Sequence, residues 1–120
     1  MQISDAESQV MEILWKRAPL GSDDVVQALS RTHAWAEPTI KTLLGRLMKK
    51  GAIKATREGR RYLYSPVLKR ETWIARESES VLKRLFDGRV APLVAHFSKA
   101  QKLSEKDIAE LRKLIDEIDP

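Results

Sequence analysis

Apolar residues recur at helical spacing along most of the chain, and the breaks between these runs predict where each helix ends. Between residues 36 and 51 the apolar positions fall every three or four residues, at the spacing of one buried helix face: Ile40, Leu43, Leu44, Leu47 and Met48. Pro38 suits the first turn of this helix, and Gly51 suits its C-terminal exit. The pattern therefore predicts an amphipathic helix over residues 38–50.

Two further helices are predicted before it. Ser4 and Glu7 have the spacing of a capping box, so the first helix is expected to begin after Ser4. The segment APLG at 18–21 ends it. Ser22 is expected to cap the second helix, whose first turn carries two acids where the helix dipole favours negative charge. The expected core positions are Val10, Ile13 and Leu14 in the first helix and Val25, Val26 and Leu29 in the second.

Two short extended runs follow between residues 53 and 66, on either side of Glu58 and Gly59. Alternating apolar and aromatic residues suit paired strands, and Pro66 ends the second run. Three helices followed by a hairpin is the order typical of a winged helix-turn-helix. We therefore expect residues 1–66 to form a winged helix-turn-helix DNA-binding domain, in a protein that is mainly α with a small β-hairpin.

The pattern is all-helical from residue 67 to residue 120. Helices are predicted over 69–87, over 89–100 and after Ser104, where Asp107 completes a second capping-box spacing. Their apolar stripes can barely cover one another, and chains this short usually need more core. Because symmetric dimers are the commonest oligomers, we expect a three-helix homodimerisation module. Its expected interface residues are Leu82, Leu85, Phe86, Leu93, Val94, Phe97, Leu111, Leu114, Ile115 and Ile118.

The distribution of charge narrows the class of partner. The chain has 120 residues, a formal net charge of +5 and a pI near 9.6. Residues 41–61 hold eight bases and one acid, whereas residues 103–120 hold three bases and six acids. A basic patch in the middle of the chain suits an anionic partner such as DNA.

The outward face of helix 38–50 carries no acid, unlike an ordinary solvated helix. We expect Thr39, Thr42 and Arg46 to contact base edges in the major groove of double-stranded operator DNA. Gly45, near the centre of this face, removes a side chain that would hold the helix away from the DNA. The residues expected to bind phosphate are Lys41, Lys49 and Lys50 on the helix and Arg57, Arg60 and Arg61 on the hairpin, or wing.

Other function classes have less support. The basic face is also compatible with an ordinary solvated face or with docking of an acidic protein, and salt-dependent binding to duplex DNA separates these interpretations. A hydrolase is disfavoured because His33 and His96 lie far apart without a motif, and we expect no catalytic residue. The absence of cysteine excludes thiolate metal sites, and no metal or cofactor is expected. The opening MQISDAESQ does not match a signal peptide and no apolar stretch reaches roughly 18 residues, so we expect a cytoplasmic protein without membrane insertion.

Several stretches resemble the penicillinase-repressor family of bacterial winged-helix repressors, whose relatives control methicillin resistance and copper transport. They are ISDAE at 3–7, ILW at 13–15, TIKTLLGRLMKKG at 39–51 after Trp35, and GRRYLYSP at 59–66. LKRLFDG, LVAHF and LSEKDIAELRKLID in the C-terminal part are similar to the dimerisation region of the same family. The resemblance implies a homodimeric transcriptional repressor that binds short inverted-repeat operators.

The resemblance also bears on induction. In the antibiotic-responsive members, a membrane-bound sensor protease triggers cleavage between an asparagine and a phenylalanine in the dimerisation region. The corresponding pair here is His96 and Phe97, so histidine stands where those members have asparagine. The copper-responsive members carry a cysteine cluster near the C-terminus, which this chain lacks. The histidine departs from the family's cleavage pattern, and the missing cysteines exclude that mode of copper sensing, so proteolysis, a ligand and a partner such as a membrane sensor protease all stay open as the inducing signal.

Overall fold

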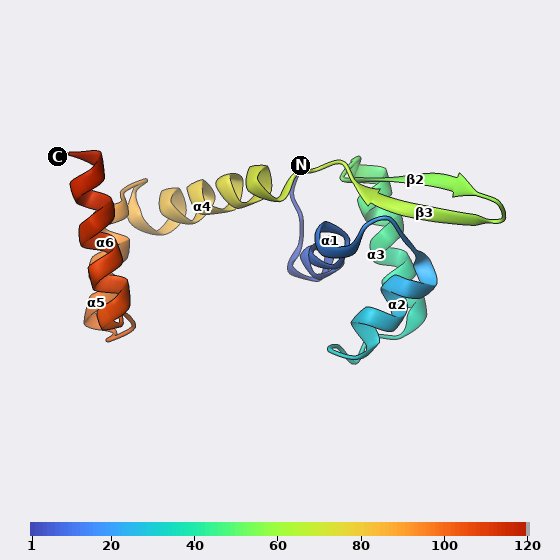
Figure 1. The fold of residues 1–120 in the computed structure, drawn as a ribbon, viewed down its shortest axis with the longest axis horizontal. Coiled ribbons are helices and arrows are strands. Elements are labelled where there is room, and N and C mark those ends of the chain that lie inside the picture. Colours follow the sequence, from blue (N-terminus) through green and yellow to red (C-terminus); the bar gives the residue numbers. More distant parts are fainter. Residues whose placement is uncertain (120) are drawn as a thin grey trace. The chain divides into compact units, whose positions relative to one another are not determined.

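The structure is a computed structural model that describes residues 1–119 (Figure 1). It divides into two compact units, of which the first spans Met1–Trp73 and the second begins at Ile74. The elements of the first unit are α1 (Asp5–Arg17), β1 (Leu20–Gly21), α2 (Ser22–Ser30), α3 (Glu37–Lys50), β2 (Ile53–Glu58) and β3 (Arg61–Pro66). The remaining helices are α4 (Arg70–Phe86), α5 (Val90–Lys99) and α6 (Glu105–Ile118).

Helices α1, α2 and α3 pack together and enclose the core of the first unit, as the apolar periodicity predicts. Core side chains come from all three helices and from the segments that follow α3; they include Val10, Met11, Leu14, Val25, Leu29, Ile40, Leu43, Leu44, Leu47 and Ile53. Burial of this apolar surface is the main stabilising contribution to the fold. It also fixes which side of α3 faces outward.

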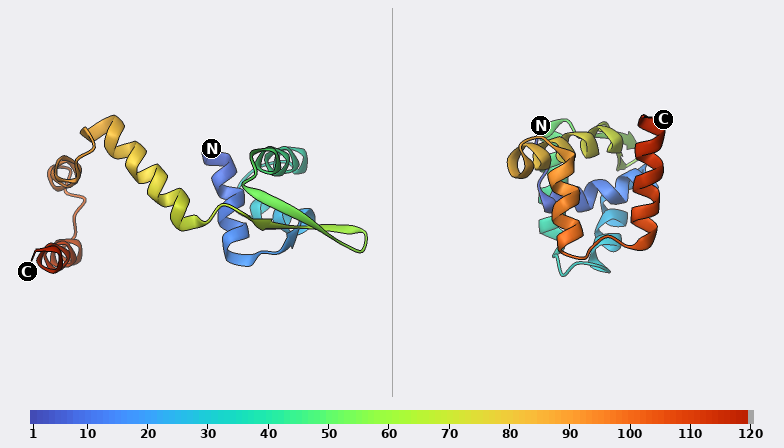
Figure 2. Two further views of the ribbon diagram at one scale, coloured as in Figure 1. Left: turned by 90° about the horizontal axis from the view of Figure 1, so that it is seen from above. Right: turned by 90° about the vertical axis from the view of Figure 1, so that its left-hand side faces the viewer.

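A three-stranded antiparallel sheet in the order β1-β3-β2 completes the first unit. The predicted hairpin is confirmed: β2 pairs with β3 from Ile53 opposite Pro66 to Glu58 opposite Arg61. The two-residue strand β1 was not predicted, and it pairs Leu20 with Tyr64 in β3. The hairpin extends away from the three helices (Figure 1 and Figure 2).

Two local predictions in this unit are wrong. Gly21, not Ser22, precedes the first turn of α2, because pairing with Leu63 of β3 holds Gly21 in an extended conformation. Its N–H donates to the Asp24 carboxylate, with 3.3 Å between the nitrogen and Oδ2. Met48 was expected in the core but is 40% exposed. At about 100° per residue it lies roughly 90° from the centre of the buried arc of α3, at the edge of the core.

The start of α4 packs against α1 within the first unit. The indole N–H of Trp15 donates to the carbonyl oxygen of Leu68 at 2.8 Å, and the rings of Trp15 and Trp73 lie 5.4 Å apart. Arg70 donates to the Glu12 carboxylate at 3.1 Å. The first unit therefore continues past the hairpin into the first turn of α4.

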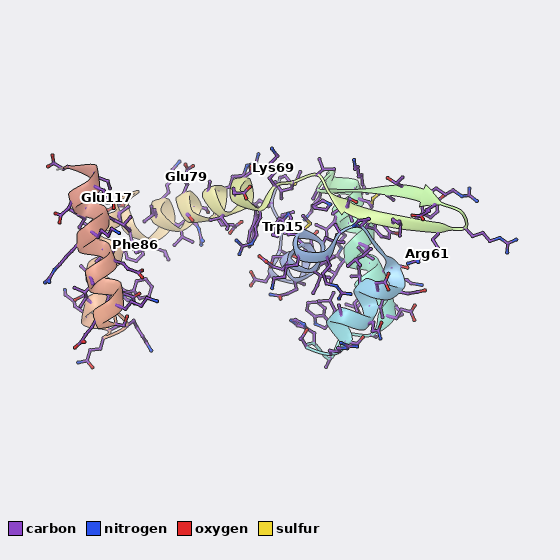
Figure 3. All side chains as sticks on the ribbon, viewed as in Figure 1. Trp15, Arg61, Lys69, Glu79, Phe86 and Glu117 are labelled. Atoms are coloured by element: carbon purple, nitrogen blue, oxygen red, sulfur yellow. The ribbon has the colours of Figure 1, made fainter. Side chains whose placement is uncertain are left out.

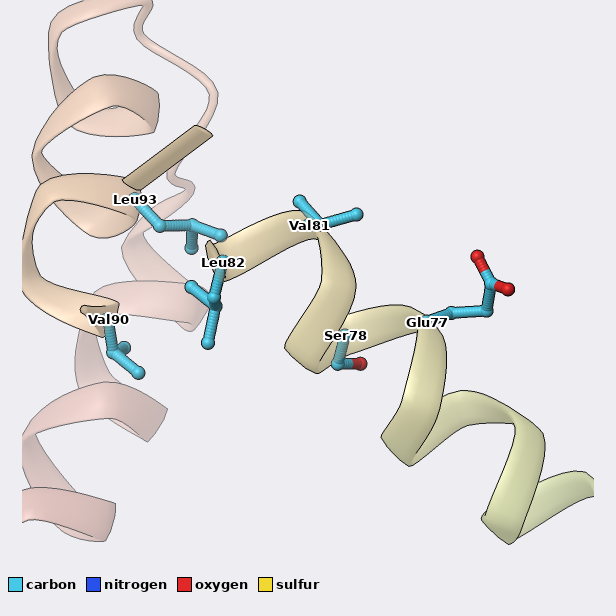
Figure 4. Close-up of a pocket in the computed structure, with 6 residues that line it drawn as sticks. All are labelled: Glu77, Ser78, Val81, Leu82, Val90 and Leu93. Carbon is cyan, nitrogen blue, oxygen red and sulfur yellow. The ribbon is translucent and has the colours of Figure 1, made fainter. Parts of the chain in front are cut away.

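The second unit contains the rest of α4 with α5 and α6, at nearly the predicted boundaries. The capping box of Ser104 and Asp107 is present, with the Asp107 N–H donating to Ser104 Oγ at 3.0 Å. None of the three helices has a fully buried residue. A cavity of about 370 Å³ between α4 and α5 is lined by Val81, Leu82, Val90 and Leu93 (Figure 4). No helix in the described residues is long and apolar enough to cross a bilayer.

Candidate nucleic-acid interface

The exposed face of α3 carries the residues expected to contact base edges. Thr39, Thr42, Gly45 and Arg46 are all exposed. Thr42 and Gly45 lie opposite the buried apolar residues of the helix, and Thr39 and Arg46 lie toward one edge of the exposed face. Gly51 ends the helix in a left-handed conformation (φ 77°), which glycine adopts without steric cost. The helix therefore presents a continuous outward face, held in place by the core behind it.

The polar side chains on this face differ in what they already bind. Thr42 donates its hydroxyl proton to the carbonyl oxygen of Pro38 at 2.9 Å, within its own helix. Lys41 forms an exposed ion pair with Glu37 at 3.2 Å, and pairs of this kind contribute little to stability. Within residues 1–119, Thr39, Arg46 and Lys49 make no side-chain hydrogen bond or ion pair, so their donors are available to an external partner.

Lys50 was expected to bind phosphate, but the structure places its ammonium group against α1. Its Nζ lies 2.6 Å from the Glu7 carboxylate and 2.8 Å from the carbonyl oxygen of Gln2. Glu7 is only 2% exposed, so this ion pair is almost fully removed from water on the carboxylate side. Lys50 therefore joins the C-terminal end of α3 to the N-terminal end of α1.

Burial and hydrogen bonding act in opposite directions on Glu7. Burial opposes ionisation of its carboxyl group, but hydrogen bonds from Lys50 and Ser4, together with the charge of Lys50, outweigh burial and lower the pKa. One carboxylate oxygen, Oε1, accepts both the Lys50 ammonium and the Ser4 N–H. The other, Oε2, is buried without a hydrogen-bond partner in the described residues. Glu7 is thus held as a carboxylate inside the first unit.

The wing carries the second group of basic side chains. Its turn consists of Gly59, with φ 63°, and Arg60, which is exposed and unpaired within the described residues. Arg57 donates to the carbonyl oxygen of Gly59 at 3.0 Å, which orders the tip of the hairpin. Arg60 is therefore the wing residue whose guanidinium group is fully available to phosphate.

Arg61 lies where β3 passes the beginning of α2 (Figure 3). Its guanidinium group donates to the Asp24 carboxylate at 3.1 Å and covers Gly21 so closely that a Cβ there would collide with it. Both partners of the ion pair are substantially exposed, so the pair adds little to stability. The pair therefore links the first residue of β3, next to the turn of the wing, to α2.

Sequence reasoning did not identify Glu7 or Asp24 as partners of the basic residues. The capping-box spacing indicated a local role for Glu7 at the start of α1, and this role is present. Its pairing with Lys50 joins residues 43 positions apart, and the Asp24–Arg61 pair joins residues 37 apart. No short-range pattern carries such information.

The two histidines lie in different units. His33 stacks on Trp35 in the loop before α3, with 4.4 Å between ring centres. His96 lies in α5, 6.1 Å from the ring of Phe86. Within residues 1–119, no group of three or more histidine, aspartate or glutamate side chains is arranged to hold a metal ion. The functional groups exposed on the α3 face and the wing are cations and hydrogen-bonding groups.

Comparison with known sequences shows which proteins this chain is similar to. The profile of a family described as "Penicillinase repressor" matches residues 3–117. The chain is 38% identical to the penicillinase repressor of Bacillus licheniformis over 116 residues, 97% of this chain and 91% of the relative. It is 31% identical to the penicillinase repressor of Staphylococcus aureus over 118 residues, covering 98% and 94%. The methicillin resistance regulatory protein MecI of Staphylococcus aureus is 27% identical over 114 residues, covering 95% and 93%.

Solved structures agree with these sequence matches. The DNA-binding domain of the repressor BlaI matches with a TM-score of 0.55 and 42% identity, covering 59% of this chain and 87% of that chain. Bacillus licheniformis BlaI in complex with the blaP half-operator matches equally well, at 42% identity and TM-score 0.55 over 60% and 88%. The Staphylococcus aureus regulator MepR, at 16% identity and TM-score 0.54 over 98% and 78%, shares the fold alone.

Proposed function

Because this chain belongs to the penicillinase repressor family, we propose that it represses transcription by binding operator DNA through α3 and the wing. The observation that carries the proposal is the exposed face of α3, where Arg46 and Lys49 have no partner in the described residues. A relative's DNA-binding domain that is 42% identical to this chain has been solved with a half-operator. The fold, the basic face and the family therefore support one function.

The proposal assigns two kinds of contact. Arg46, Thr42 and Thr39 contact base edges in the major groove, and these contacts determine sequence preference. The phosphate-binding residues are Lys41 and Lys49 on α3 and Arg57, Arg60 and Arg61 on the wing. Lys50, whose ammonium group is engaged by Glu7, acts instead by fixing the position of α3.

The first test is a fluorescence-anisotropy titration of the full chain at two salt concentrations. The first duplex is the sequence that this protein enriches from a library of random-sequence DNA. The second duplex is a scrambled version of the first. We expect binding to the selected duplex to exceed binding to the scrambled one at the higher salt. Equal, salt-fragile binding to both would mean that the basic face is only electrostatic, and docking of an acidic protein would then be the better explanation.

Replacing Arg60 with alanine should weaken binding to both duplexes by the same factor. Arg60 is exposed at the tip of the wing, and the proposal assigns its guanidinium group to phosphate rather than to bases. The slope of log affinity against log salt should therefore decrease in magnitude by roughly one unit. Titrations over a series of salt concentrations measure this slope. A loss confined to the selected duplex would show that Arg60 contacts a base instead.

We also propose that α4, α5 and α6 mediate homodimerisation. The ten expected interface residues are either half-buried or exposed in the single chain; Leu114, Ile115 and Ile118 are 53%, 62% and 83% exposed. Apolar residues that line one side of successive helices without cover are typical of an interface between subunits. A dimer would place two α3 helices on the two halves of an inverted repeat, as symmetric operators require.

Replacing Ile115 with glutamate should raise the dissociation constant of the dimer by about tenfold, since an apolar contact is exchanged for a charge. Analytical ultracentrifugation over a range of concentrations measures this constant. Ala109→Glu is the matched control, because Ala109 is exposed on the opposite side of α6 and receives the same charge. Equal effects of the two substitutions would exclude the apolar face of α6 from the interface.

Induction by a membrane sensor protease or another partner belongs to the same proposal. His96 and Phe97, the pair that corresponds to the family's cleavage site, lie within α5. The His96 carbonyl oxygen accepts from the Ala100 N–H at 3.0 Å, and that of Phe97 accepts from Lys102 at 2.9 Å. Cleavage between them would therefore require the C-terminal part of α5 to unwind first.

A further inference from the structure

Gly45 has no structural reason to be glycine. It lies in the middle of α3, where an ordinary helical backbone suits any residue with high helix propensity, and glycine there costs about 0.5–1 kcal/mol relative to alanine. A Cβ built on it would meet nothing within 4 Å outside the backbone of its own helix. The other glycines differ: Gly51, Gly59 and Gly88 have positive φ, and Gly21 is covered by Arg61. Within the described residues, no contact and no backbone conformation therefore requires glycine at position 45.

Thr42 lies three residues before Gly45 on the same face, and its hydroxyl group is already engaged. It donates to the carbonyl oxygen of Pro38, so its proton is not available to a base. What remains for contact outside the helix is chiefly the methyl group. Residues three apart on a helix have Cβ atoms about 5–6 Å apart. The place left empty by Gly45 is therefore at methyl-contact distance from the Thr42 side chain.

We propose that Thr42 and Gly45 form a notch that accepts the 5-methyl group of a thymine in the major groove of each operator half-site. This inference rests on the proposed function and specifies what part of the binding face recognises. The thymine methyl is the apolar feature that distinguishes this base in the major groove, and threonine methyl groups are suitable contacts for it. The notch contains the Thr42 methyl and the Gly45 Cα, and it offers no free hydrogen-bond donor.

Neighbouring residues support thymine rather than another base at this position. Guanine, adenine and cytosine present no methyl group in the major groove, so none of them would gain an apolar contact in the notch. Arg46, adjacent to Gly45 and unpaired within residues 1–119, is available for guanine at a neighbouring base pair. A side chain at position 45 would occupy the space that the methyl group needs. The notch therefore recognises thymine by the shape of its methyl group, whereas the neighbouring Arg46 recognises a base by hydrogen bonding.

The test removes single methyl groups from the DNA. In the duplex that the full chain selects from random-sequence DNA, each thymine is replaced in turn by deoxyuridine, which lacks only the 5-methyl group. We expect the wild-type protein to lose about fourfold in affinity at one thymine per half-site, the value of one buried methyl group, and little elsewhere. If no thymine in the selected duplex showed this loss of affinity, the inference would be overturned. Enrichment of a specific duplex would still support the proposed repressor function. If no duplex were enriched, both the proposed function and the inference would fail.

Protein variants then identify which residues contact that methyl group. Thr42→Ser keeps the hydroxyl bond to Pro38 but lacks the methyl, so it should bind the thymine and deoxyuridine duplexes equally. Thr72→Ser, which removes a methyl group from an exposed threonine of α4 outside the proposed DNA-binding face, is the matched control and should keep the fourfold difference. If Thr42→Ser retained the wild-type difference, the notch would be wrongly placed.

Adding a side chain at position 45 should raise the stability of the protein and lower its affinity for the thymine duplex. Gly45→Ala is expected to raise the melting temperature by roughly 2–8 °C, because alanine favours the helix. The same substitution should lower affinity for the thymine duplex on the order of tenfold, as a crowded contact does, and leave scrambled DNA within about twofold. Gly45→Leu should lower it further. A more stable Gly45→Ala protein with undiminished affinity for the thymine duplex would overturn the inference.

Discussion

Replacing Arg46 with alanine is expected to remove most of the preference for operator over scrambled DNA, a loss of roughly 5- to 150-fold in the affinity ratio. Arg46 is exposed on the α3 face, and its guanidinium group is unpaired among the described residues. It can donate two parallel hydrogen bonds to O6 and N7 of a guanine, which is the commonest specific contact in the major groove. Anisotropy titrations of the selected and scrambled duplexes at the same salt concentration measure the ratio.

Two further variants separate base contact from charge. Arg46→Lys keeps the positive charge but lacks the planar pair of donors, so it should lose most of the same preference. Lys49→Ala removes a neighbouring exposed charge and should weaken binding to both duplexes alike. If Arg46→Ala weakened both duplexes equally and left their ratio intact, Arg46 would bind phosphate, and the assignment of the base-contacting face would be wrong.

The fold was largely predictable because its signals are short in range. The apolar spacing in α3 and the capping boxes at Ser4 and Ser104 each involve residues within a few positions of one another. The hairpin was predicted from alternating residues around a glycine turn. Strand β1 was missed, since two residues carry no periodicity and become a strand only by pairing with β3.

The α3 face was predictable for the same reason, but the partners of its charges were not. A basic residue on an exposed arc looks the same in sequence whether it is free, as Arg46 is within residues 1–119, or paired, as Lys50 is. The difference depends on how α1 packs across the end of α3. This packing brings together Glu7 in α1 and Lys50 in α3, which are 43 positions apart in the sequence. Only the three-dimensional structure shows that they are neighbours.

The Glu7–Lys50 pair leads to the second large effect, which is on stability. Replacing Glu7 with alanine should lower the free energy of unfolding by about 2–3 kcal/mol, because it removes a buried ion pair and the capping box of α1. The loss falls short of the largest values known for buried pairs because the Lys50 side chain is 35% exposed and can turn to water. Urea denaturation followed by circular dichroism measures the change. Glu12→Ala, which removes the exposed partner of Arg70, is the matched control and should cost less than about 1 kcal/mol.

The pH dependence of unfolding tests the same pair independently of side-chain size. The pKa of Glu7 is lowered from its ordinary value of 4.5, so the unfolded chain takes up a proton at this carboxyl group more readily than the folded chain does. Its contribution to stability is therefore complete above about pH 4.5 and is lost as the pH falls through the lowered pKa of the folded state. Glu7→Gln keeps the shape but cannot titrate, so its unfolding free energy should fall less steeply than that of the wild type below pH 4.5. Lys50→Met should flatten the curve in the same way, whereas Lys49→Met should not, because Lys49 has no ionic partner within residues 1–119. If the unfolding free energies of the wild type and Glu7→Gln changed in parallel with pH, the Glu7–Lys50 pair would not couple protonation to folding. Lys50 would then be free to bind phosphate, as the sequence alone predicts.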